Sequence, residues 1–286
     1  MKKALFVGNG VNRLSSSSAS WEQLLNQLAG PTLTDHEHEV RKNKPFTLLF
    51  EELESRSPSS ELKETVAVAF SKSLSSNAFH RDLMQLGYDE ILTTNYDYCL
   101  EEATDYSWQS KNSAPETVHS LFRRRASAEA NIWHIHGEAG SANTIMLGHS
   151  HYAGYLQKIR SYITAGVSTE SKKRGKRPYV SKYTKSKYVH DTDSWVDVFL
   201  EFHLDIVGFG MDYTENHIWN LLTEKRKLAK RGLSVGTTTY HRCSDEKQNT
   251  SDEARLSLLE SFGVKIQDHT KATYEESYHA CIDSLG

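Results

Sequence analysis

Two short segments combine side chains that can transfer protons with side chains that can bind a sugar. Residues 93–97 (TTNYD) supply a carboxamide and a carboxylate, and residues 134–137 (HIHG) supply two imidazoles. Each segment closes an apolar run, and a Gly8-Asn9-Gly10 turn precedes both. A neutral imidazole near pH 7 can accept a proton from a hydroxyl group or a water molecule. This order of groups is what a site that cleaves a nucleotide at its sugar carbon would need.

Asn95 and Asp97 stand at the start of an expected helix. One of them could be the N-cap, because both residue types accept a hydrogen bond from free backbone N–H groups. A single cap does not require an Asn, an Asp and two threonines together. The second interpretation is therefore a carboxamide and a carboxylate that hold ribose hydroxyls and a nicotinamide amide.

His134 and His136 are two positions apart on an expected strand, which directs both side chains to one face. Gly137 lets the chain turn after His136 and lets a substrate come close. We therefore expect His136 to be the functional imidazole and His134 to be a buried, hydrogen-bonded support.

Two glycine-rich segments are expected to approach the same ligand. Residues 8–13 (GNGVNR) follow the first apolar run, and residues 208–212 (GFGMD) follow a later one. Glycines there permit positive φ and bring backbone N–H groups close to a pyrophosphate. Arg13 replaces the third glycine of the dinucleotide-binding fingerprint, so a tight structural turn is a comparable interpretation of the first segment.

The cysteines and the remaining histidines give little support for a metal. Cys99, Cys243 and Cys281 form no CxxC pair, which argues against structural zinc and against a disulfide framework. A second His-x-His pair, His149 and His151, could join the first pair at a metal ion. We expect this second pair to lie in a loop with no carboxylate in register, and we therefore predict no metal.

Apolar runs of strand length alternate with helical patterns along most of the chain. The expected strands are 4–7, 90–93, 131–136, 144–147, 204–207, 233–240 and 263–266. The expected helices are about 20–30, 96–103, 194–202, 215–228, 252–262 and 274–285, with a helical block at about 35–86. This alternation predicts an α/β, Rossmann-like, mostly parallel sheet with helices on both faces, and the block predicts a helical cap. Ligands of such sheets lie beyond the carboxyl ends of the strands, where Gly8, Asn95, His136 and Gly208 all fall.

Composition narrows the class of protein. The chain has 286 residues, 37% hydrophobic content and a net charge of -3, so we expect one soluble domain over 1–286 in the cytoplasm and no dedicated nucleic-acid binder. No run approaches the roughly 20 apolar residues of a membrane span, and the N-terminal run is too short for a signal peptide. An insertion at about 168–190 carries lysines and arginines interleaved with tyrosines. It is either a solvated loop or a contact for an anionic partner such as a nucleic acid.

The order of these motifs resembles that of the sirtuin superfamily, over roughly residues 4–285. The resemblance is closest to the divergent sirtuin-like proteins of bacterial antiphage defence, which hydrolyse NAD to nicotinamide and ADP-ribose and so starve the infected cell. Protein-deacylating sirtuins carry four zinc-binding cysteines, and this chain lacks them. The resemblance therefore implies a sirtuin-like domain without a zinc module, and NAD hydrolysis in preference to protein deacylation.

The resemblance also implies roles for individual residues. Asn95 would position the ribose and the attacking water, His136 would be the general base, and Asp97 would belong to the nicotinamide pocket. The residues implied to bind NAD are Gly8, Gly10, Val11, Asn12, Thr94, Gly208, Phe209 and Gly210. NAD would be the substrate, with no metal. The implied partners are further copies of the chain and a separately encoded sensor or activator protein, with no membrane.

Three alternatives stay open at this point. The first is a NAD-dependent protein deacylase, which shares the cleavage of the nicotinamide–ribose bond. The second is a non-catalytic sensor that binds NAD or ADP-ribose, and the third is a metal hydrolase.

Overall fold

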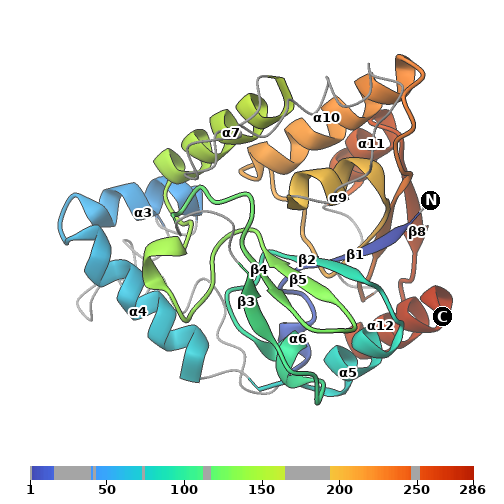
Figure 1. The fold of residues 1–286 in the computed structure, drawn as a ribbon, viewed down its shortest axis with the longest axis horizontal. Coiled ribbons are helices and arrows are strands. Elements are labelled where there is room, and N and C mark those ends of the chain that lie inside the picture. The colour runs from blue at the N-terminus through green and yellow to red at the C-terminus, as the bar shows by residue number, and fades with distance from the viewer. Residues whose placement is uncertain are drawn as a thin grey trace.

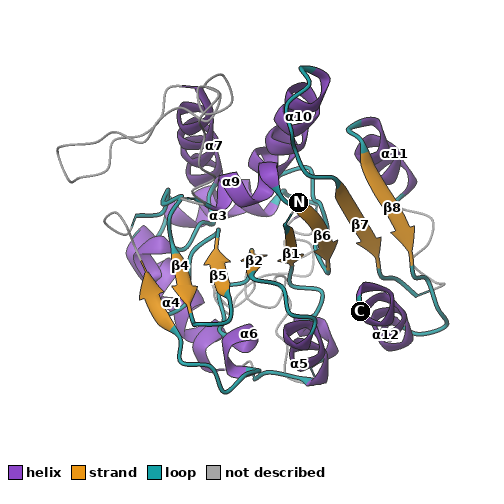
Figure 2. Ribbon diagram, turned by 45° about the vertical axis from the view of Figure 1, so that its right-hand side comes forward, coloured by secondary structure: helices purple, strands orange, loops and turns teal. Residues whose placement is uncertain are grey.

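The fold is built on one mixed sheet with helices on both of its faces. The computed structural model describes residues 2–15, 40, 43–72, 75–111, 117–164, 194–245 and 252–286. The basic insertion at 168–190 and the expected helix at 20–30 lie outside these residues. Within the described part, eight strands pair in the order β3-β4-β5-β2-β1-β6-β7-β8 (Figure 2).

Six of these strands are parallel, as the alternation of strands and helices predicts. They are β5 (Asn131–His134), β2 (Glu90–Thr93), β1 (Lys3–Val7), β6 (His203–Val207), β7 (Thr238–Arg242) and β8 (Val264–Asp268). The short strands β3 (Gln109–Lys111) and β4 (Arg124–Ala126) extend the sheet in antiparallel pairing beside β5. The predicted mostly parallel, Rossmann-like sheet is therefore confirmed.

The helices cover the two faces of the sheet as separate layers (Figure 1). One face carries α7 (His149–Thr164), α9 (Trp195–Glu201), α10 (Asn216–Lys230) and α11 (Glu253–Ser261). The other face carries α5 (Ala78–Gln85), the short α6 (Cys99–Glu102) and α12 (Tyr274–Leu285). Two single-turn 3₁₀ helices, η1 (Asn12–Leu14) and η2 (Ala142–Thr144), lie in the connections.

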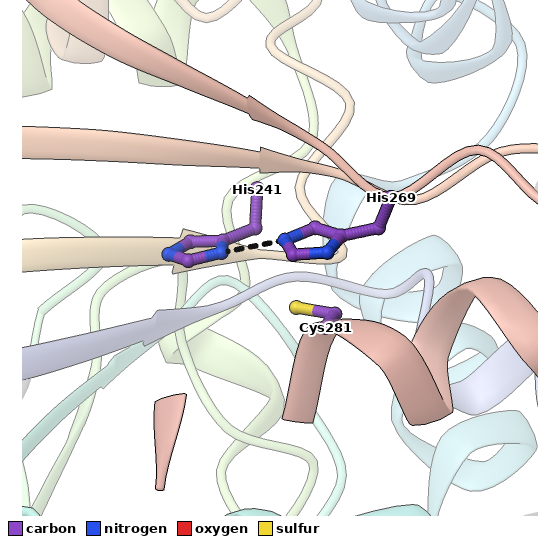
Figure 3. A group of neighbouring side chains, drawn as sticks. All are labelled: His241, His269 and Cys281. Atoms are coloured by element: carbon purple, nitrogen blue, oxygen red, sulfur yellow. Dashed lines mark hydrogen bonds between the residues drawn. The ribbon is translucent and has the colours of Figure 1, made fainter. Parts of the chain in front are cut away.

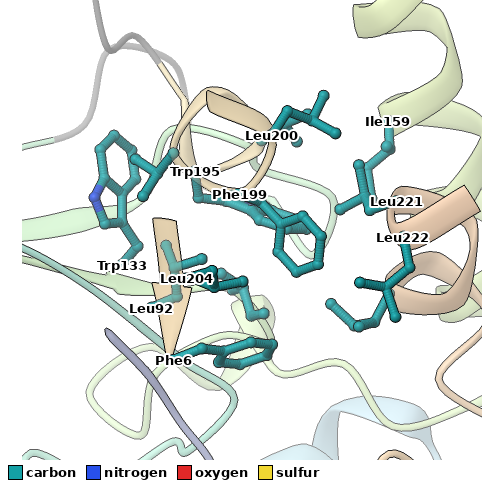
Figure 4. Close-up of a cluster of buried hydrophobic side chains, with 14 of the residues drawn as sticks. Phe6, Leu92, Trp133, Ile159, Trp195, Phe199, Leu200, Leu204, Leu221 and Leu222 are labelled. Carbon is teal, nitrogen blue, oxygen red and sulfur yellow. The ribbon is translucent and has the colours of Figure 1, made fainter. Parts of the chain in front are cut away.

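The central strand β1 contributes side chains to both cores. Ala4 and Phe6 belong to the core under α7, α9 and α10, whereas Leu5 and Val7 belong to the core under α5 and α12. Successive side chains of a strand point to opposite faces, so a strand buried on both sides is apolar throughout. Figure 4 shows the larger core, in which Phe6 lies near aromatic and leucine side chains of the covering helices.

The predicted helical cap at about 35–86 divides between two places. Helix α3 (Phe46–Glu54) packs on α7, and α4 (Ser59–Lys72) packs on η2. Their apolar side chains form a third core with the segment that follows His136. Helix α5 instead packs on α6 and α12, against the face of the sheet.

Four local predictions are wrong. Residues 144–147 form no strand, because the chain turns through η2 and its apolar side chains fill two cores instead of a sheet position. Residues 149 and 151 begin helix α7 and are not in a loop. The strand expected at 233–240 begins only at Thr238, and the helix expected at 96–103 is limited to Cys99–Glu102.

The strand order creates a crevice at one point of the sheet. The chain runs from β1 outward through β2 to β5 and later returns to the other side of β1 with β6, so the order of the strands reverses between β1 and β6. In open parallel sheets such a switch point leaves an uncovered space beyond the carboxyl ends of the strands, where ligands bind. The described helices include none that is long and apolar enough to cross a membrane.

Candidate active site

A cavity of about 650 Å³ lies beyond the carboxyl ends of the central strands. Its size falls within the usual range for a small-molecule or cofactor site. The segments that line it follow β1, β2, β5 and β6 or belong to and follow β7, with additional residues from α3, α4, α7, α11 and α12. Its lining residues include Gly10, Arg13, Thr94, Asn95, His136, Tyr152, Gly208, Phe209, Gly210, Asp212, Glu215, His241, Cys243, Asp252, Arg255, Tyr274 and Tyr278.

The glycine turns after β1 and β6 are in direct contact. The Gly8 N–H donates to the carbonyl of Val207, and the Gly10 N–H donates to the carbonyl of Gly208 at 2.8 Å. A Cβ at Gly8 would lie 2.5 Å from the Gly208 carbonyl oxygen, so no side chain fits between the two turns. Gly208 itself has a φ of +68°, which favours glycine. The glycines therefore let two strand ends meet at the floor of the cavity.

The eight residues implied to bind NAD divide between the cavity and its support. Gly10, Thr94, Gly208, Phe209 and Gly210 line the cavity. Gly8, Val11 and Asn12 are not among its lining residues. These three are buried or half-buried behind the turn, and they shape it without forming its surface.

Asn95 lines this space and carries an unsatisfied acceptor. Its side chain is buried, its Nδ2 donates weakly to the Gly8 carbonyl at 3.4 Å, and its Oδ1 has no hydrogen-bond partner among the described residues. A buried polar atom without a partner costs about 1–3 kcal/mol, so such atoms are uncommon and point to a ligand or a water. Asn95 is therefore suited to accept a hydrogen bond from a bound hydroxyl group.

Asp97 does not line the cavity. Its Oδ1 accepts from the backbone N–H of Cys99, at the start of α6, and its Oδ2 accepts from Asn12 Nδ2 at 2.8 Å. The Asn12 carboxamide also interacts with His80 Nε2 at 2.9 Å. The N-cap of α6 is Tyr98, without a side-chain cap hydrogen bond, so Asp97 is not the N-cap. Asp97 instead ties the first glycine turn to α5 and α6.

His134 has contacts on both ring nitrogens. Nε2 lies 2.8 Å from Glu101 Oε1, and Nδ1 lies 3.1 Å from the backbone oxygen of Asn95. Burial opposes protonation, but the Glu101 carboxylate outweighs it and raises the pKa of His134. These contacts are those of a structural residue that holds the Asn95 backbone in place.

His136 points to the other side of the sheet from His134, so the prediction that both share one face is wrong. Strand β5 ends at His134, and Gly137 adopts a φ of +107°. The His136 carbonyl accepts a hydrogen bond from the N–H of Met146, and its ring meets α10 and α7. The period-2 rule applies only within a strand, and the turn reverses the direction of the second imidazole.

The ring of His136 forms a buried cluster with Glu215 and His217. His136 Nε2 lies 2.9 Å from His217 Nε2 and 3.5 Å from Glu215 Oε2. Glu215 Oε2 and His217 Nδ1 have no hydrogen-bond partners among the described residues. Glu215 stands at the N-terminal end of α10, and Tyr152 of α7 packs against both imidazoles.

The electrostatics of this cluster favour neutral groups. Burial and the nearby Arg123 lower the pKa of His136 to about 3, and burial lowers the pKa of His217 well below its ordinary value. Burial and the charge of Asp212 raise the pKa of Glu215 to about 8. At pH 7 the cluster therefore contains two neutral imidazoles and a protonated carboxyl group, which can relay a proton without a net buried charge.

Sequence reasoning missed Glu215, His217 and Tyr152. The pair Glu215-x-His217 does follow the glycine-rich end of β6, in the way that Asn95 follows β2. Polar residues soon after a parallel strand were the available signal. Tyr152 carried no such signal, since its segment was assigned to a loop.

The opposite end of the cavity is basic and aromatic. Arg13 lies over the ring of Tyr274, with 5.8 Å from its guanidinium carbon to the ring centroid. Arg255 forms an ion pair with Asp252. Two guanidinium groups among tyrosine rings can bind phosphate oxygens and stack on a planar base. The two ends of the cavity thus differ in chemistry.

The four histidines considered as a metal site do not converge. His134 is engaged with Glu101, and His151 Nδ1 accepts from the N–H groups of Leu147 and Gly148. Within the described residues, two other groups place possible ligand atoms within 4.8 Å of one another: His136 with Glu215 and His217, and His241 with His269 and Cys281.

The family of the chain follows from comparison with known proteins. The family model of the SIR2-like domain matches residues 89–266, from just before β2 into β8. This is more than half of the chain. The protein belongs to the SIR2-like family. No curated protein matches the chain.

Membership in the SIR2-like family makes the function NAD-related. The matched residues include Asn95, His136 and the Glu215–His217 segment, whereas the first glycine turn precedes them. The wall that carries the unpartnered acceptor and the imidazole cluster therefore lies within the SIR2-like match.

Proposed function

We propose that this SIR2-like protein is a NAD glycohydrolase that cleaves NAD to nicotinamide and ADP-ribose. The observation that carries the proposal is the unpartnered, buried Oδ1 of Asn95 in the same cavity as the neutral His136–Glu215 cluster. The nicotinamide ring of NAD is cationic, and it leaves as a neutral molecule with the electrons of the bond, so positive charge develops at the ribose carbon. A site for this step must therefore hold the ribose and admit one water molecule. It does not need to supply a strong nucleophile.

Each group of the cavity has a place in this reaction. Asn95 Oδ1 would accept a hydrogen bond from a ribose hydroxyl and so fix the sugar carbon. His136 would accept a proton from the attacking water and pass it toward His217, which lies within hydrogen-bonding distance. Arg13 and Arg255, at the other end, would bind the diphosphate of NAD.

The low pKa of His136 sets a limit on its role. An imidazole with a pKa of about 3 is a weak base, so it does not create hydroxide in advance of bond cleavage. An oxocarbenium-like centre reacts readily with neutral water, and a weak base that removes the proton late in the step is sufficient. In such a reaction the site stabilises the departure of nicotinamide, and removal of the proton from the water follows.

The assay of this proposal is the release of nicotinamide from NAD by the purified chain, measured across a range of protein concentrations. We expect turnover that Asn95→Ala and His136→Ala each reduce by at least 100-fold. Asn131→Ala and His203→Ala are matched controls, because they make the same changes at the amino ends of β5 and β6. Full activity in both cavity variants would contradict the assignment.

The same assay separates the other NAD-related functions. Turnover that requires an added acyl-lysine peptide would identify a deacylase. NAD or ADP-ribose binding by calorimetry, without turnover at any protein concentration, would identify a sensor. Loss of turnover on chelation would identify a metal-dependent hydrolase.

The biological part of the proposal is antiphage defence by depletion of NAD in the infected cell's cytoplasm. It rests on the resemblance to divergent sirtuin-like defence proteins and on the absence of the four cysteines of deacylases. Self-assembly into a homo-oligomer, or a separately encoded activator, would start the activity. The test is cellular NAD after phage challenge in bacteria that express the wild-type chain or Asn95→Ala, with a fall expected only for the wild type.

A further inference from the structure

A second cluster of ligand-type side chains lies between the edge strands and the last helix. His241 comes from β7, His269 follows β8, and Cys281 comes from α12 (Figure 3). One nitrogen or sulfur atom of each lies within 4.8 Å of the others. All three side chains are buried, with exposed fractions of 3%, 7% and 0%. Three separate elements thus direct nitrogen and sulfur donors to one point.

The two imidazoles are held in a defined arrangement. His241 Nδ1 lies 3.0 Å from His269 Nε2, and the planes of the two rings differ by 9°. A tetrahedral ion about 2.0–2.1 Å from each nitrogen would separate two such atoms by about 3.3 Å. The two nitrogens would therefore have to move apart by about 0.3 Å, and the rings would have to rotate so that both lone pairs face the ion.

Asp205 contacts the second ring nitrogen of His241. Its Oδ1 lies 3.1 Å from His241 Nε2, while its Oδ2 accepts a hydrogen bond from the Tyr88 hydroxyl at 2.9 Å. A carboxylate on one ring nitrogen keeps the proton there and leaves the lone pair of the other nitrogen free. Metal-binding histidines commonly have such a carboxylate partner.

Cys243 is not among the three side chains whose ligand atoms lie within 4.8 Å of one another, but it lies beside Cys281 and offers a fourth donor and a route from solvent. It follows His241 by two positions, and its thiol interacts by a hydrogen bond with that of Cys281. Both His241 and Cys243 also line the large cavity, so an ion could reach the cluster from that side. The complete donor set is two imidazoles and two thiols.

We propose that His241, Cys243, His269 and Cys281 form a zinc site beside the cavity. Two nitrogen and two sulfur donors are the ligand set that Zn²⁺ takes in tetrahedral structural sites. Hard cations such as Mg²⁺ or Ca²⁺ prefer oxygen ligands, which the four donors do not offer. The proposal departs from the prediction of no metal, which was based on spacing along the chain, because the donors come together only in the fold.

The site would join α12 to the edge of the sheet. Helix α12 also carries Tyr274 and Tyr278, which line the cavity, and the Tyr274 hydroxyl lies 3.3 Å from the carbonyl oxygen of Gly10. A bound ion would therefore fix one wall of the cavity. This inference is independent of NAD hydrolysis and has its own test.

The first experiment measures zinc itself. Tag-free chain is kept under a thiol reductant, stripped with a chelator, and titrated with Zn²⁺ against a competing chelator, with bound zinc counted by atomic emission. We expect one zinc per chain. Cys281→Ser and His269→Ala should lower the affinity by at least 100-fold, and Asp205→Asn should lower it by about 10–100-fold. Cys99→Ser, another buried cysteine but on α6, should leave it unchanged.

The second experiment uses Co²⁺ with the wild-type chain, so it does not depend on how well a variant folds. Thiolate ligation should give near-ultraviolet charge-transfer absorption, which Zn²⁺ abolishes and Cys281→Ser lacks. Wild-type protein without stoichiometric zinc, or a cobalt spectrum without thiolate bands, would overturn the proposal. The cluster would then be a hydrogen-bonded histidine pair beside two thiols.

Discussion

The imidazoles of His136 and His217 meet through their Nε2 atoms at 2.9 Å, although 81 positions separate them in the sequence. One residue follows β5 and the other lies in the first turn of α10. Both rings are neutral near pH 7, so one N–H donates to the lone pair of the other. His217 thereby fixes which proton His136 carries and which way its ring faces.

Replacing His217 should reduce catalysis more than substrate binding. His217→Leu removes the partner of His136 Nε2, and we expect kcat for NAD cleavage to fall by about 100-fold with little change in KM. His217→Gln keeps a hydrogen-bonding group at this position and should retain more activity. Equal losses in both variants, with an unchanged KM, would show that the hydrogen bond does not matter.

The protonated Glu215 should make the stability of the fold depend on pH. Its pKa rises from 4.5 to about 8 on folding. Between these values the folded state binds more protons than the unfolded state, so this group's stabilising contribution is complete below about pH 4.5 and is lost as pH rises to about 8. Near pH 6–7 the slope approaches about 1.4 kcal/mol per pH unit.

Denaturant unfolding of the wild type and of Glu215→Gln at pH 5 and pH 8 measures this effect. The variant has no titrating carboxyl, so its free energy of unfolding should improve relative to the wild type as pH rises. A gap between the wild type and Glu215→Gln that stays constant with pH would contradict the raised pKa.

A methyl group at Gly10 should disrupt the contact between the two glycine turns. The added Cβ would lie 2.8 Å from the Gly208 carbonyl oxygen and closer still to the Tyr278 hydroxyl. We expect Gly10→Ala to destabilise the chain by about 1–3 kcal/mol. Gly210→Ala is the matched control, because a Cβ there has nothing within 4 Å. Urea unfolding compares the two, and equal stability would argue that the turns can separate freely.

His134→Ala should act on stability, in contrast to His136→Ala. Removing the imidazole leaves the buried Glu101 carboxylate without its 2.8 Å partner, although Arg125 lies 3.6 Å away. Breaking one member of a buried ion pair typically costs about 3–5 kcal/mol. We expect a clear loss in thermal unfolding for His134→Ala and a smaller one for His136→Ala, and the reverse order would exchange their roles.

The sequence predicted the parts of the fold that depend on local pattern. Apolar runs such as Leu5–Val7 and Ile91–Leu92 are buried on both faces, so their identity as parallel strands could be read directly. Asn95 was predicted for the same reason, because it follows such a run. The failure at 144–147 occurred where apolar side chains are divided between two cores and have no repeating period. Residues 149 and 151 begin α7, whose buried residues Tyr152, Tyr155 and Ile159 recur at helical spacing, so a helical signal was present there.

The cluster around His136 could not be derived in the same way. Its members come from the turn after β5, from α7 and from the start of α10, and only packing brings Tyr152 and Glu215 to the imidazole. The direction of His136 also depends on the turn at Gly137, which reverses the strand alternation. Tertiary contacts of this kind carry no signal in local spacing.

The position of β1 governs when the cavity can form during folding. This strand is the first in the chain, yet its neighbours begin at residues 90 and 203. Pairings across such distances are formed late and slowly, since long loops must close first. On the ribosome, β1 therefore stays without one neighbour until residues 203–207 have been made. A nascent chain consequently has no complete cavity before β6 and the glycine turn after it have emerged.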